Sequence, residues 1–389
     1  MAVMLQRLSQ GLRTGFAVAL LTVATYAAAQ GVRGDHPDTY VVQRGDTLWD
    51  IAGRFLKRPW LWPEIWQANP QIHNPHLIYP GDVISLAYLN RLGLEPGPRD
   101  GAPITAVPLS EIEPFLKDLR VVDRYEHLPY VVGLEDDRLR ASRGQVAYVR
   151  GLANAVPGTR YAVVRPTVQY THLERAGMCC DIFPKNDLDY RGRRELDFQQ
   201  FWTNAVFPEK GSEILGYELM KLNVGTITRG EVGGIEASTL LLDEEGREVR
   251  IGDRLVAVDP QPYDLQFFPH PPRAQTEYGR ARVIAVADML TSGGPRDVVA
   301  LSVGAREGID NGTVFSIWRE GSNVVDEVRY GRDREPFTVD FEDKVRLPDE
   351  FAGHVMVFRT FERVSYGLVM DSIKPSRVGY HLKHPDAPY

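Results

Sequence analysis

The chain has 389 residues, 43% of them hydrophobic and 25% charged, which indicates a folded protein of two or three domains and excludes a largely disordered one. Its formal net charge is −7 at pH 7, and −9 without residues 1–29, which carry two arginines and no acid. This acidity argues against a nucleic-acid role, because neutralising phosphates requires clustered lysine and arginine.

The N-terminus has the features of a secretory signal peptide. Arg7 and Arg13 precede an apolar stretch over residues 16–24, and three alanines follow at 27–29. A charged region, a short apolar region and an Ala-x-Ala end mark such peptides. We therefore expect cleavage after Ala29 and export to the periplasm. An uncleaved anchor is the alternative, disfavoured because a membrane span needs about twenty apolar residues.

The densest pattern in the chain lies between residues 38 and 87. Its first half predicts a strand at the apolar run 40–42 and then a turn over 45–47, where Asp46 or Thr47 can cap a helix. Apolar residues at i, i+3 and i+4 spacing predict that helix over 48–55.

The second half of the pattern predicts another helix and a returning strand. The helix fits residues 63–68 and ends near Asn69, because Pro70 disfavours helical torsions in the residue before it. Val83, Ile84 and Leu86 supply the strand. The order is therefore strand, helix, helix, strand.

This pattern resembles the LysM module, which binds glycans that contain N-acetylglucosamine, most often bacterial peptidoglycan. The resemblance covers about an eighth of the chain and departs from a minimal module over residues 57–63, where the connection between the helices is longer and more aromatic. The matching residues are Tyr40, Val42, Gly45, Asp46, Thr47, Leu48, Trp49, Ile51 and Ala52, followed by Ile65, Ala68, Asn69, Ile78, Pro80, Gly81 and Val83.

The resemblance implies a shallow groove between two loops, whose backbone groups would bind the acetamido group of the sugar. Leu48, Ile72 and Leu77 would pack the acetyl methyl group. Alternatives remain at single positions: Asp46 or Thr47 can equally be a helix cap, and Asn69 can mainly fix the turn before Pro70. The implied site residues are Gly45, Asp46, Thr47 and Leu48 in the first loop and Asn69, Pro70, Gln71, Ile72, Leu77 and Ile78 in the second.

Four tryptophans fall in this small segment. We expect Trp49 and Trp66 in its core, because so small a domain needs large apolar side chains. Trp60 and Trp62 have two interpretations of equal weight. They are either an exposed stacking surface for glycan or a docking face for the remainder of the chain.

Residues 88–119 predict a linker rich in proline and glycine. It ends in a short helix over 110–119, because Ser110 and Glu113 have the spacing of a capping box. Pro114 would limit that helix to a turn or two.

From residue 120 onwards, short alternating apolar runs separated by turn residues predict a β-rich region. We expect one β-domain over 120–260, with a polar insertion near 170–206, and another over 274–389. A glycine turn followed by a strand recurs at Gly158, Gly252, Gly312 and Gly379, from either duplication or convergence. The predicted fold class is α+β, a LysM module followed by small barrels or sandwiches.

No pattern in the sequence predicts a metal, a cofactor or a catalytic group. Cys179 and Cys180 are adjacent and too poor in neighbouring ligands for a zinc site. The histidine pairs 73/76 and 381/384 lack the glutamate of a zinc peptidase, and no nucleophile elbow occurs.

The expected function is therefore binding rather than catalysis. The LysM module would tether β-rich interaction domains to peptidoglycan or another N-acetylglucosamine glycan. An envelope protein is the expected partner of the β-rich region. The alternative is a cell-wall hydrolase with an unrecognised site in that region, since two acids can pair in space without a sequence pattern.

Overall fold

The computed structural model describes residues 37–72, 78–86, 109–152, 155–175, 190–195, 213–258, 268–274, 280–287, 292–326, 328 and 344–387. The expected signal peptide, Leu77, most of the linker and Cys179-Cys180 lie outside these ranges. The chain forms two compact units, unit 1 up to Leu109 and unit 2 from Ser110 onwards. Within the described ranges, no helix combines the length and apolar character needed to cross a bilayer.

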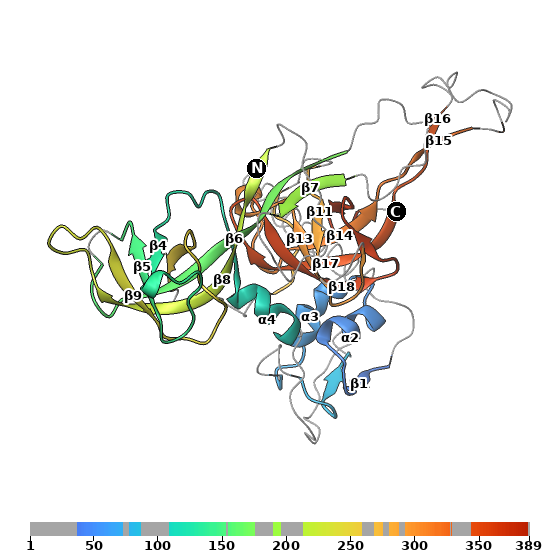
Figure 1. Ribbon diagram of the computed structural model, residues 1–389. Helices are drawn as coiled ribbons and strands as arrows, with labels where there is room; N and C mark the ends of the chain where they lie inside the picture. The colour runs from blue at the N-terminus through green and yellow to red at the C-terminus, as the bar shows by residue number, and fades with distance from the viewer. Residues whose placement is uncertain are drawn as a thin grey trace, which may run out of the picture. The chain divides into compact units, whose positions relative to one another are not determined.

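Unit 1 has the predicted order of elements (Figure 1). Strand β1 (Thr39–Val41) pairs antiparallel with β2 (Val83–Ser85). Between them in sequence come α2 (Leu48–Phe55), the short 3₁₀ helix η1 (Pro59–Leu61) and α3 (Trp62–Gln67). The predicted helices and strands are thus confirmed to within one or two residues.

Unit 2 is β-rich, and six of its strands between residues 130 and 257 close into a ring, called barrel one here. Its pairing order is β8, β9, β5, β4, β10 and β6, and β6 pairs again with β8. Backbone hydrogen bonds from Val131 to Asp253 and from Leu255 to Pro129 tie β4 to β10. The bounds are β4 (Tyr130–Leu134), β5 (Val146–Arg150), β6 (Arg160–Arg175), β8 (Ile214–Arg229), β9 (Ser238–Leu242) and β10 (Arg254–Ala257).

Strands β6 and β8 are each 16 residues long and extend well beyond barrel one (Figure 1). Their register runs from Arg160 opposite Thr226 to Thr171 opposite Ile214. In the outer part, β3 (Leu119–Val122) pairs with β8, and β7 (Tyr190–Glu195) pairs with β6. The sheet therefore continues beyond barrel one.

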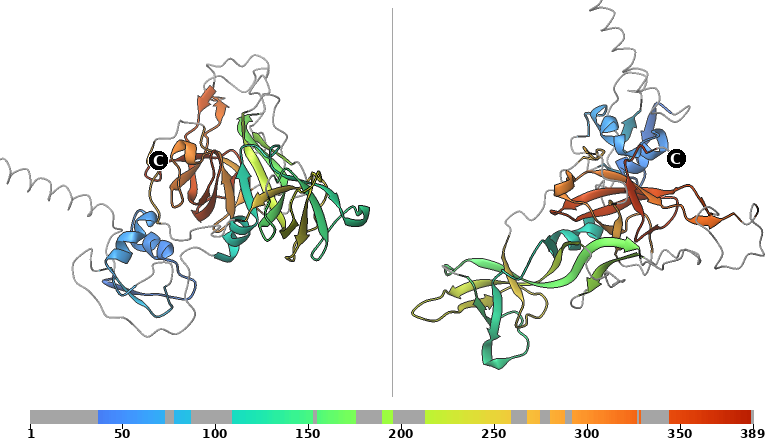
Figure 2. Two further views of the ribbon diagram at one scale, coloured as in Figure 1. Left: turned by 90° about the vertical axis from the view of Figure 1, so that its left-hand side faces the viewer. Right: turned by 90° about the horizontal axis from the view of Figure 1, so that it is seen from above.

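Six later strands form a second ring, called barrel two, which Figure 2 shows in orange and red. Backbone hydrogen bonds from Val283 to Tyr380 and from Leu382 to Ala281 join its first and last strands. Valine, leucine and isoleucine side chains dominate its core, together with Phe315. In pairing order the strands are β11 (Val283–Val286), β13 (Val298–Leu301), β18 (Ser365–Ser372), β17 (Glu350–Thr360), β14 (Val314–Arg319) and β20 (His381–Lys383).

The described residues of unit 2 also contain two short strand pairs and two 3₁₀ turns. Strand β12 (Ser292–Gly293) pairs with β19 (Ser376–Arg377), and β15 (Asn323–Val325) pairs with β16 (Lys344–Arg346). The 3₁₀ turns are η3 (Glu135–Asp137) and η5 (Ala305–Glu307). The predicted α+β class, a LysM-like module followed by small β-barrels, is confirmed.

The recurring glycine turn adopts one geometry at all four predicted positions. Gly158, Gly252, Gly312 and Gly379 have φ values of 92°, 93°, 98° and 93°. Each glycine is the third residue of a four-residue turn closed by a backbone hydrogen bond of 3.1–3.2 Å. A left-handed third residue is typical of a type II turn, which explains the requirement for glycine.

The structure corrects two sequence expectations. A polar loop was expected from Tyr170 onwards, but β6 continues to Arg175 and residues 190–195 form β7. Strand β7 is the last strand of its sheet, so its backbone hydrogen bonds to β6 do not require an alternating apolar pattern.

The helix before β3 is also longer than expected. Helix α4 (Leu109–Lys117) passes through Pro114 for two and a half turns. The guanidinium of Arg359, on β17, donates hydrogen bonds to the carbonyls of Phe115 (2.7 Å) and Leu116 at its C-terminal end. A cation at a helix C-terminus offsets the helix dipole, and this contact from a distant strand stabilises the helix despite Pro114.

Candidate functional site

The first loop of unit 1 is built by local hydrogen bonds. Gly45 has a φ of 94°, and the turn closes with a 3.1 Å hydrogen bond from the Asp46 amide to the Gln43 carbonyl. Thr47 is the N-cap of α2 and forms a capping box with Asp50. The cap expected of Asp46 or Thr47 is therefore made by Thr47.

Asp46 has a different structural role, which is to join β1, the first loop and α2. Its carboxylate accepts hydrogen bonds from the Tyr40 hydroxyl (2.7 Å), the Gln43 amide (2.8 Å) and the Arg54 guanidinium (3.0 Å). Arg54 also donates to the Tyr40 hydroxyl and lies over its ring. Burial and the neighbouring Asp46 carboxylate raise the pKa of Tyr40. Hydrogen bonds to β1, to Gln43 and to α2 thus hold the first loop in place.

Asn69 holds the second loop against β2. Its side-chain amide nitrogen donates to the carbonyls of Ile65 (2.7 Å) and Ser85 (2.9 Å). Its side-chain oxygen accepts from the Ser85 amide (2.7 Å) and from the Gln71 side chain (2.9 Å). Asn69 is completely buried, and these four hydrogen bonds match the alternative in which it fixes the turn.

The second loop begins at Asn69, just after the C-cap of α3. A 2.9 Å hydrogen bond from the Ile72 amide to the Asn69 carbonyl closes a turn that contains Pro70 and Gln71. The Trp66 indole nitrogen donates to the Ile72 carbonyl (2.6 Å). The indole therefore sets the path of this loop.

The two loops are connected through the strand pair. The Val42 amide, just before the first loop, donates to the Asp82 carbonyl (2.9 Å), and the Gly81 amide donates to the Val42 carbonyl (2.9 Å). Strand β2 also holds the second loop, because the Asn69 side chain donates to the Ser85 carbonyl and the Gln71 side chain donates to the Val83 carbonyl. One small sheet thus positions both loops.

The predicted site residues divide into an exposed and a buried group. Gly45 and Pro70 are exposed, and Thr47 and Gln71 are partly exposed. Leu77 lies outside the described residues. The buried group consists of Asp46, Leu48, Asn69, Ile72 and Ile78, none of them more than 5% exposed. Direct contact with a ligand is thus available mainly to the exposed group and to backbone atoms, while the buried group shapes the loops.

Sequence reasoning missed Arg54 and Ser85, which hold the loops in place. Arg54 lies on the exposed side of α2 and Ser85 in β2, and neither has a sequence signal that links it to its partner. Trp49 is buried, as expected, whereas Trp66 is partly exposed. Trp60 and Trp62 are buried, at 5% and 3%, and so do not lie as exposed stacking surfaces.

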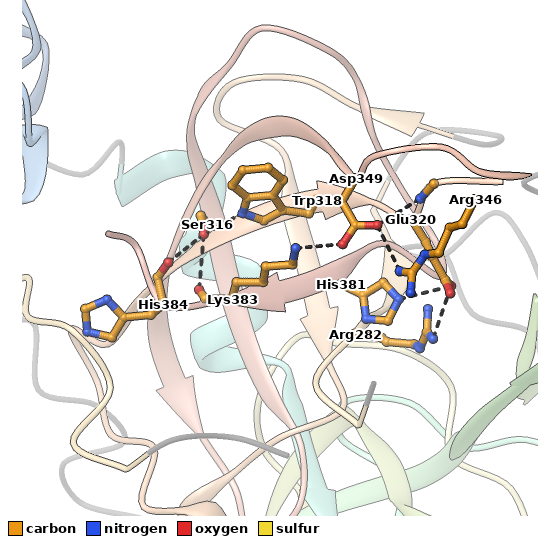
Figure 3. Close-up of polar contacts among 10 residues, drawn as sticks. Arg282, Ser316, Trp318, Glu320, Arg346, Asp349, His381, Lys383 and His384 are labelled. Atoms are coloured by element: carbon orange, nitrogen blue, oxygen red, sulfur yellow. Dashed lines mark hydrogen bonds and ion pairs between the residues drawn. The ribbon is translucent and has the colours of Figure 1, made fainter. Parts of the chain in front are cut away.

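Barrel two carries a second concentration of polar side chains, around its last strand (Figure 3). The Lys383 ammonium lies 2.7 Å from an Asp349 carboxylate oxygen and 4.5 Å from the centre of the Trp318 ring. Asp349 also accepts from the Gly321 amide (3.0 Å) and from Arg346 (3.2 Å). These contacts fasten β20 to the segments on either side of the β15–β16 pair.

The two C-terminal histidines occupy different environments in this cluster (Figure 3). His381 is buried, and its Nε2 lies 3.1 Å from Glu320, which also pairs with Arg282 at 3.5 Å. The His384 side chain is about half exposed. Across the described parts of the chain, no three His, Cys, Asp or Glu side chains are grouped as metal ligands would be.

Comparison with known proteins identifies unit 1. A family profile described as "LysM domain" matches residues 40–87. A protein of Bacillus subtilis (strain 168), named "Uncharacterized protein YqbP", is 38% identical over 60 residues, which cover 13% of this chain and 27% of that protein. The match thus spans about a quarter of the relative. Residues 40–87 of this chain are a LysM domain.

Proposed function

We propose that this protein binds peptidoglycan through its LysM domain and thereby tethers unit 2, as a non-catalytic interaction unit, to the cell wall. The observation that carries the proposal is the LysM domain itself, with both loops held by hydrogen bonds. LysM domains bind glycans that contain N-acetylglucosamine, such as peptidoglycan. Preorganised loops favour binding, because little ordering entropy is then lost on association.

The exposed residues of the loops suit an N-acetylated sugar. At Gly45, a Cβ atom would meet nothing within 4 Å, so the backbone beside it is open to a ligand. Pro70 offers an apolar face, and the partly exposed Thr47 and Gln71 offer hydroxyl and amide groups. One such shallow site binds weakly by itself, so a second contact with the wall would add avidity.

The arrangement of Ser316, His354 and Asp371 supports the non-catalytic part of the proposal. They are cross-strand neighbours on β14, β17 and β18, and His354 Nδ1 lies 2.8 Å from Asp371. These three residues are of the types that form the Ser-His-Asp triad of hydrolases. However, the Ser316 hydroxyl donates to the His384 carbonyl (2.8 Å) and accepts from the Trp318 indole (2.8 Å). A nucleophile would instead donate to the histidine.

The location that we propose is the periplasm. It is supported by the charged and apolar segments before Ala29 and by the glycan class of the LysM domain. The envelope partner of unit 2 is part of the same proposal.

The test is co-sedimentation with purified peptidoglycan sacculi. The samples are the chain without residues 1–29 and a shorter chain from Leu109 onwards, which lacks the LysM domain. Soluble muropeptides are measured in the same supernatants. We expect the longer chain alone to pellet and no fragments to appear. If the two chains pelleted to the same extent, the LysM domain would not be the anchor. Release of muropeptides that depends on the protein would show that unit 2 is an enzyme.

A further inference from the structure

Unit 2 contains a cleft of about 1010 Å³, which lies where the start of β8 meets the β17–β18 turn and the loop after β3. This volume is at the upper end of the range of about 300–1,000 Å³ that is typical of small-molecule sites. The charged and polar side chains that line it are Asp123, Arg124, Glu126, His127, Glu213, Tyr217 and Arg363.

One wall of the cleft is a fixed loop. The ring of Tyr125 packs edge-on against Tyr217, with centroids 5.0 Å apart. On its other side, the guanidinium of Arg254 lies 5.7 Å from the centre of the Tyr125 ring. Leu128, at the end of the loop, packs against a buried apolar cluster. The loop therefore presents its charged side chains from a defined position.

Three arginines gather around Glu213, which lines the cleft together with one of them, Arg363. Three guanidiniums, from Arg280, Arg306 and Arg363, lie 3.3 Å, 3.6 Å and 3.6 Å from the carboxylate of Glu213. These arginines come from three separate segments of barrel two. A 3.1 Å hydrogen bond to the Ile214 carbonyl anchors Arg363. Guanidinium groups are the side chains best suited to binding a carboxylate with two parallel hydrogen bonds.

The loop wall of the cleft carries side chains of both charges, including Arg124. Asp123 and Glu126 come from the loop wall, together with His127. Burial raises the pKa of Tyr217, and the carboxylate of Glu126 adds to the rise, so the phenol keeps its proton as a hydrogen-bond donor. A lining that holds both carboxylates and guanidiniums is complementary to a ligand that carries an ammonium group and a carboxylate.

The ion pairs around Glu213 are poor candidates for a purely stabilising role. The side chains of Arg280, Arg306, Arg363 and Glu213 are 32–48% exposed, and their separations exceed 3.2 Å. Exposed pairs with such geometry contribute little to stability. A ligand carboxylate that entered the cleft would meet guanidiniums already held in place.

We propose that this cleft binds a short zwitterionic peptide, with its carboxylate at Arg363 and its amino group at Glu126. The identity of the natural ligand as a peptidoglycan stem peptide rests on the proposed function. In that case the LysM domain holds the glycan and the cleft holds the peptide, which supplies the second contact that avidity requires.

The binding experiment uses the full exported chain, residues 30–389, and a synthetic stem tetrapeptide with free carboxylates and one free amino group. Calorimetry compares wild type with Arg363→Gln and Glu126→Gln. Arg150→Gln is the matched control, because it removes an exposed arginine that pairs with Glu236 on barrel one, away from the cleft. We expect about tenfold weaker binding for each cleft variant and no change for the control.

A chemical control separates lost charge from altered shape. The same tetrapeptide with an amidated C-terminus should bind wild type about tenfold more weakly, and Arg363→Gln should not weaken it further. Equal binding of the free peptide by wild type and Arg363→Gln overturns the proposal. So does the absence of measurable binding by wild type.

Sacculi stripped of stem peptides distinguish this proposal from the LysM function. If the chain binds the free peptide and intact sacculi but not stripped sacculi, the cleft stands and the LysM anchor fails. If it binds stripped sacculi and not the peptide, the LysM anchor stands and the cleft proposal fails. Unchanged thermal unfolding midpoints confirm that each variant is folded.

Discussion

The hydroxyl of Tyr366, on barrel two, lies 2.7 Å from a carboxylate oxygen of Glu218, on β8. The same oxygen accepts from Tyr170 (2.7 Å), and the other accepts from Thr167 (3.1 Å). None of these four side chains is measurably exposed to solvent. A buried carboxylate needs such partners, and here they come from both the extended sheet and barrel two. The contact therefore joins the two parts of unit 2.

Tyr366→Phe should destabilise unit 2. The change removes one hydrogen bond to a buried carboxylate without altering the shape of the ring, so we expect the free energy of unfolding to fall by about 1–3 kcal/mol. Urea denaturation measures the difference. Tyr148→Phe, on β5, is the control. If both substitutions lowered the free energy of unfolding equally, the expected contribution of the hydrogen bond to Glu218 would be contradicted.

Gly45→Arg should abolish binding to sacculi, because the long side chain would project from the exposed first loop. It also forces a non-glycine residue to a φ of 94°, which costs about 1–2 kcal/mol. Gly158→Arg is the matched control, since Gly158 has a φ of 92° and equally open surroundings in barrel one. Loss of sedimentation with both variants would point to unfolding rather than to a blocked groove.

Asn69→Leu should unfold the LysM domain and leave unit 2 folded. The substitution keeps a similar volume but leaves the amide and carbonyl of Ser85 and the carbonyl of Ile65 without their partner. Each unsatisfied buried group costs about 1–3 kcal/mol, which together exceeds what so small a domain can lose. Four of the six tryptophans lie in this domain, so fluorescence reports its unfolding directly. A native spectrum would contradict the role of Asn69.

Asp349 should make the stability of barrel two depend on acid pH. Burial alone would raise its pKa, but the Gly321 amide, Lys383 and Arg346 together hold the pKa of Asp349 below its ordinary value of 3.8. A lowered pKa in the folded state contributes stability that is present above 3.8 and is lost as the pH falls through the folded-state pKa.

Asp349→Asn should therefore lower stability at neutral pH and flatten this loss in acid. Thermal unfolding midpoints between about pH 2 and pH 6 measure the effect. Asp136→Asn is the control, because the Asp136 side chain is 73% exposed. A wild-type acid transition that persists unchanged in Asp349→Asn would assign it to other carboxylates.

Local interactions account for the features that could be predicted from the sequence. Helix α2, its Thr47 cap and the turns at Gly158, Gly252, Gly312 and Gly379 all depend on partners within three or four positions along the chain. The LysM domain was predicted on the same basis, because its fixed positions lie within one short segment.

Tertiary structure decided the features whose partners are distant in sequence. Both barrels close through pairings between residues more than 40 positions apart, β6 with β8 in barrel one and residues 281–283 with 380–382 in barrel two. Strand β7 forms without an apolar pattern because β6 provides its hydrogen bonds. Helix α4 continues through Pro114 with Arg359 bound at its end.

The LysM domain and the cleft of unit 2 also differ in how far the sequence predicted them. The sequence by itself determined that a LysM domain is present at residues 40–87. Only the tertiary structure decided that Asn69 is saturated by buried hydrogen bonds, and that Arg280, Arg306 and Arg363 converge on Glu213. The physical reason is that hydrogen bonds within a turn or helix are encoded by neighbouring residues. The charge of a cleft, in contrast, depends on which distant strands the closed barrels bring together.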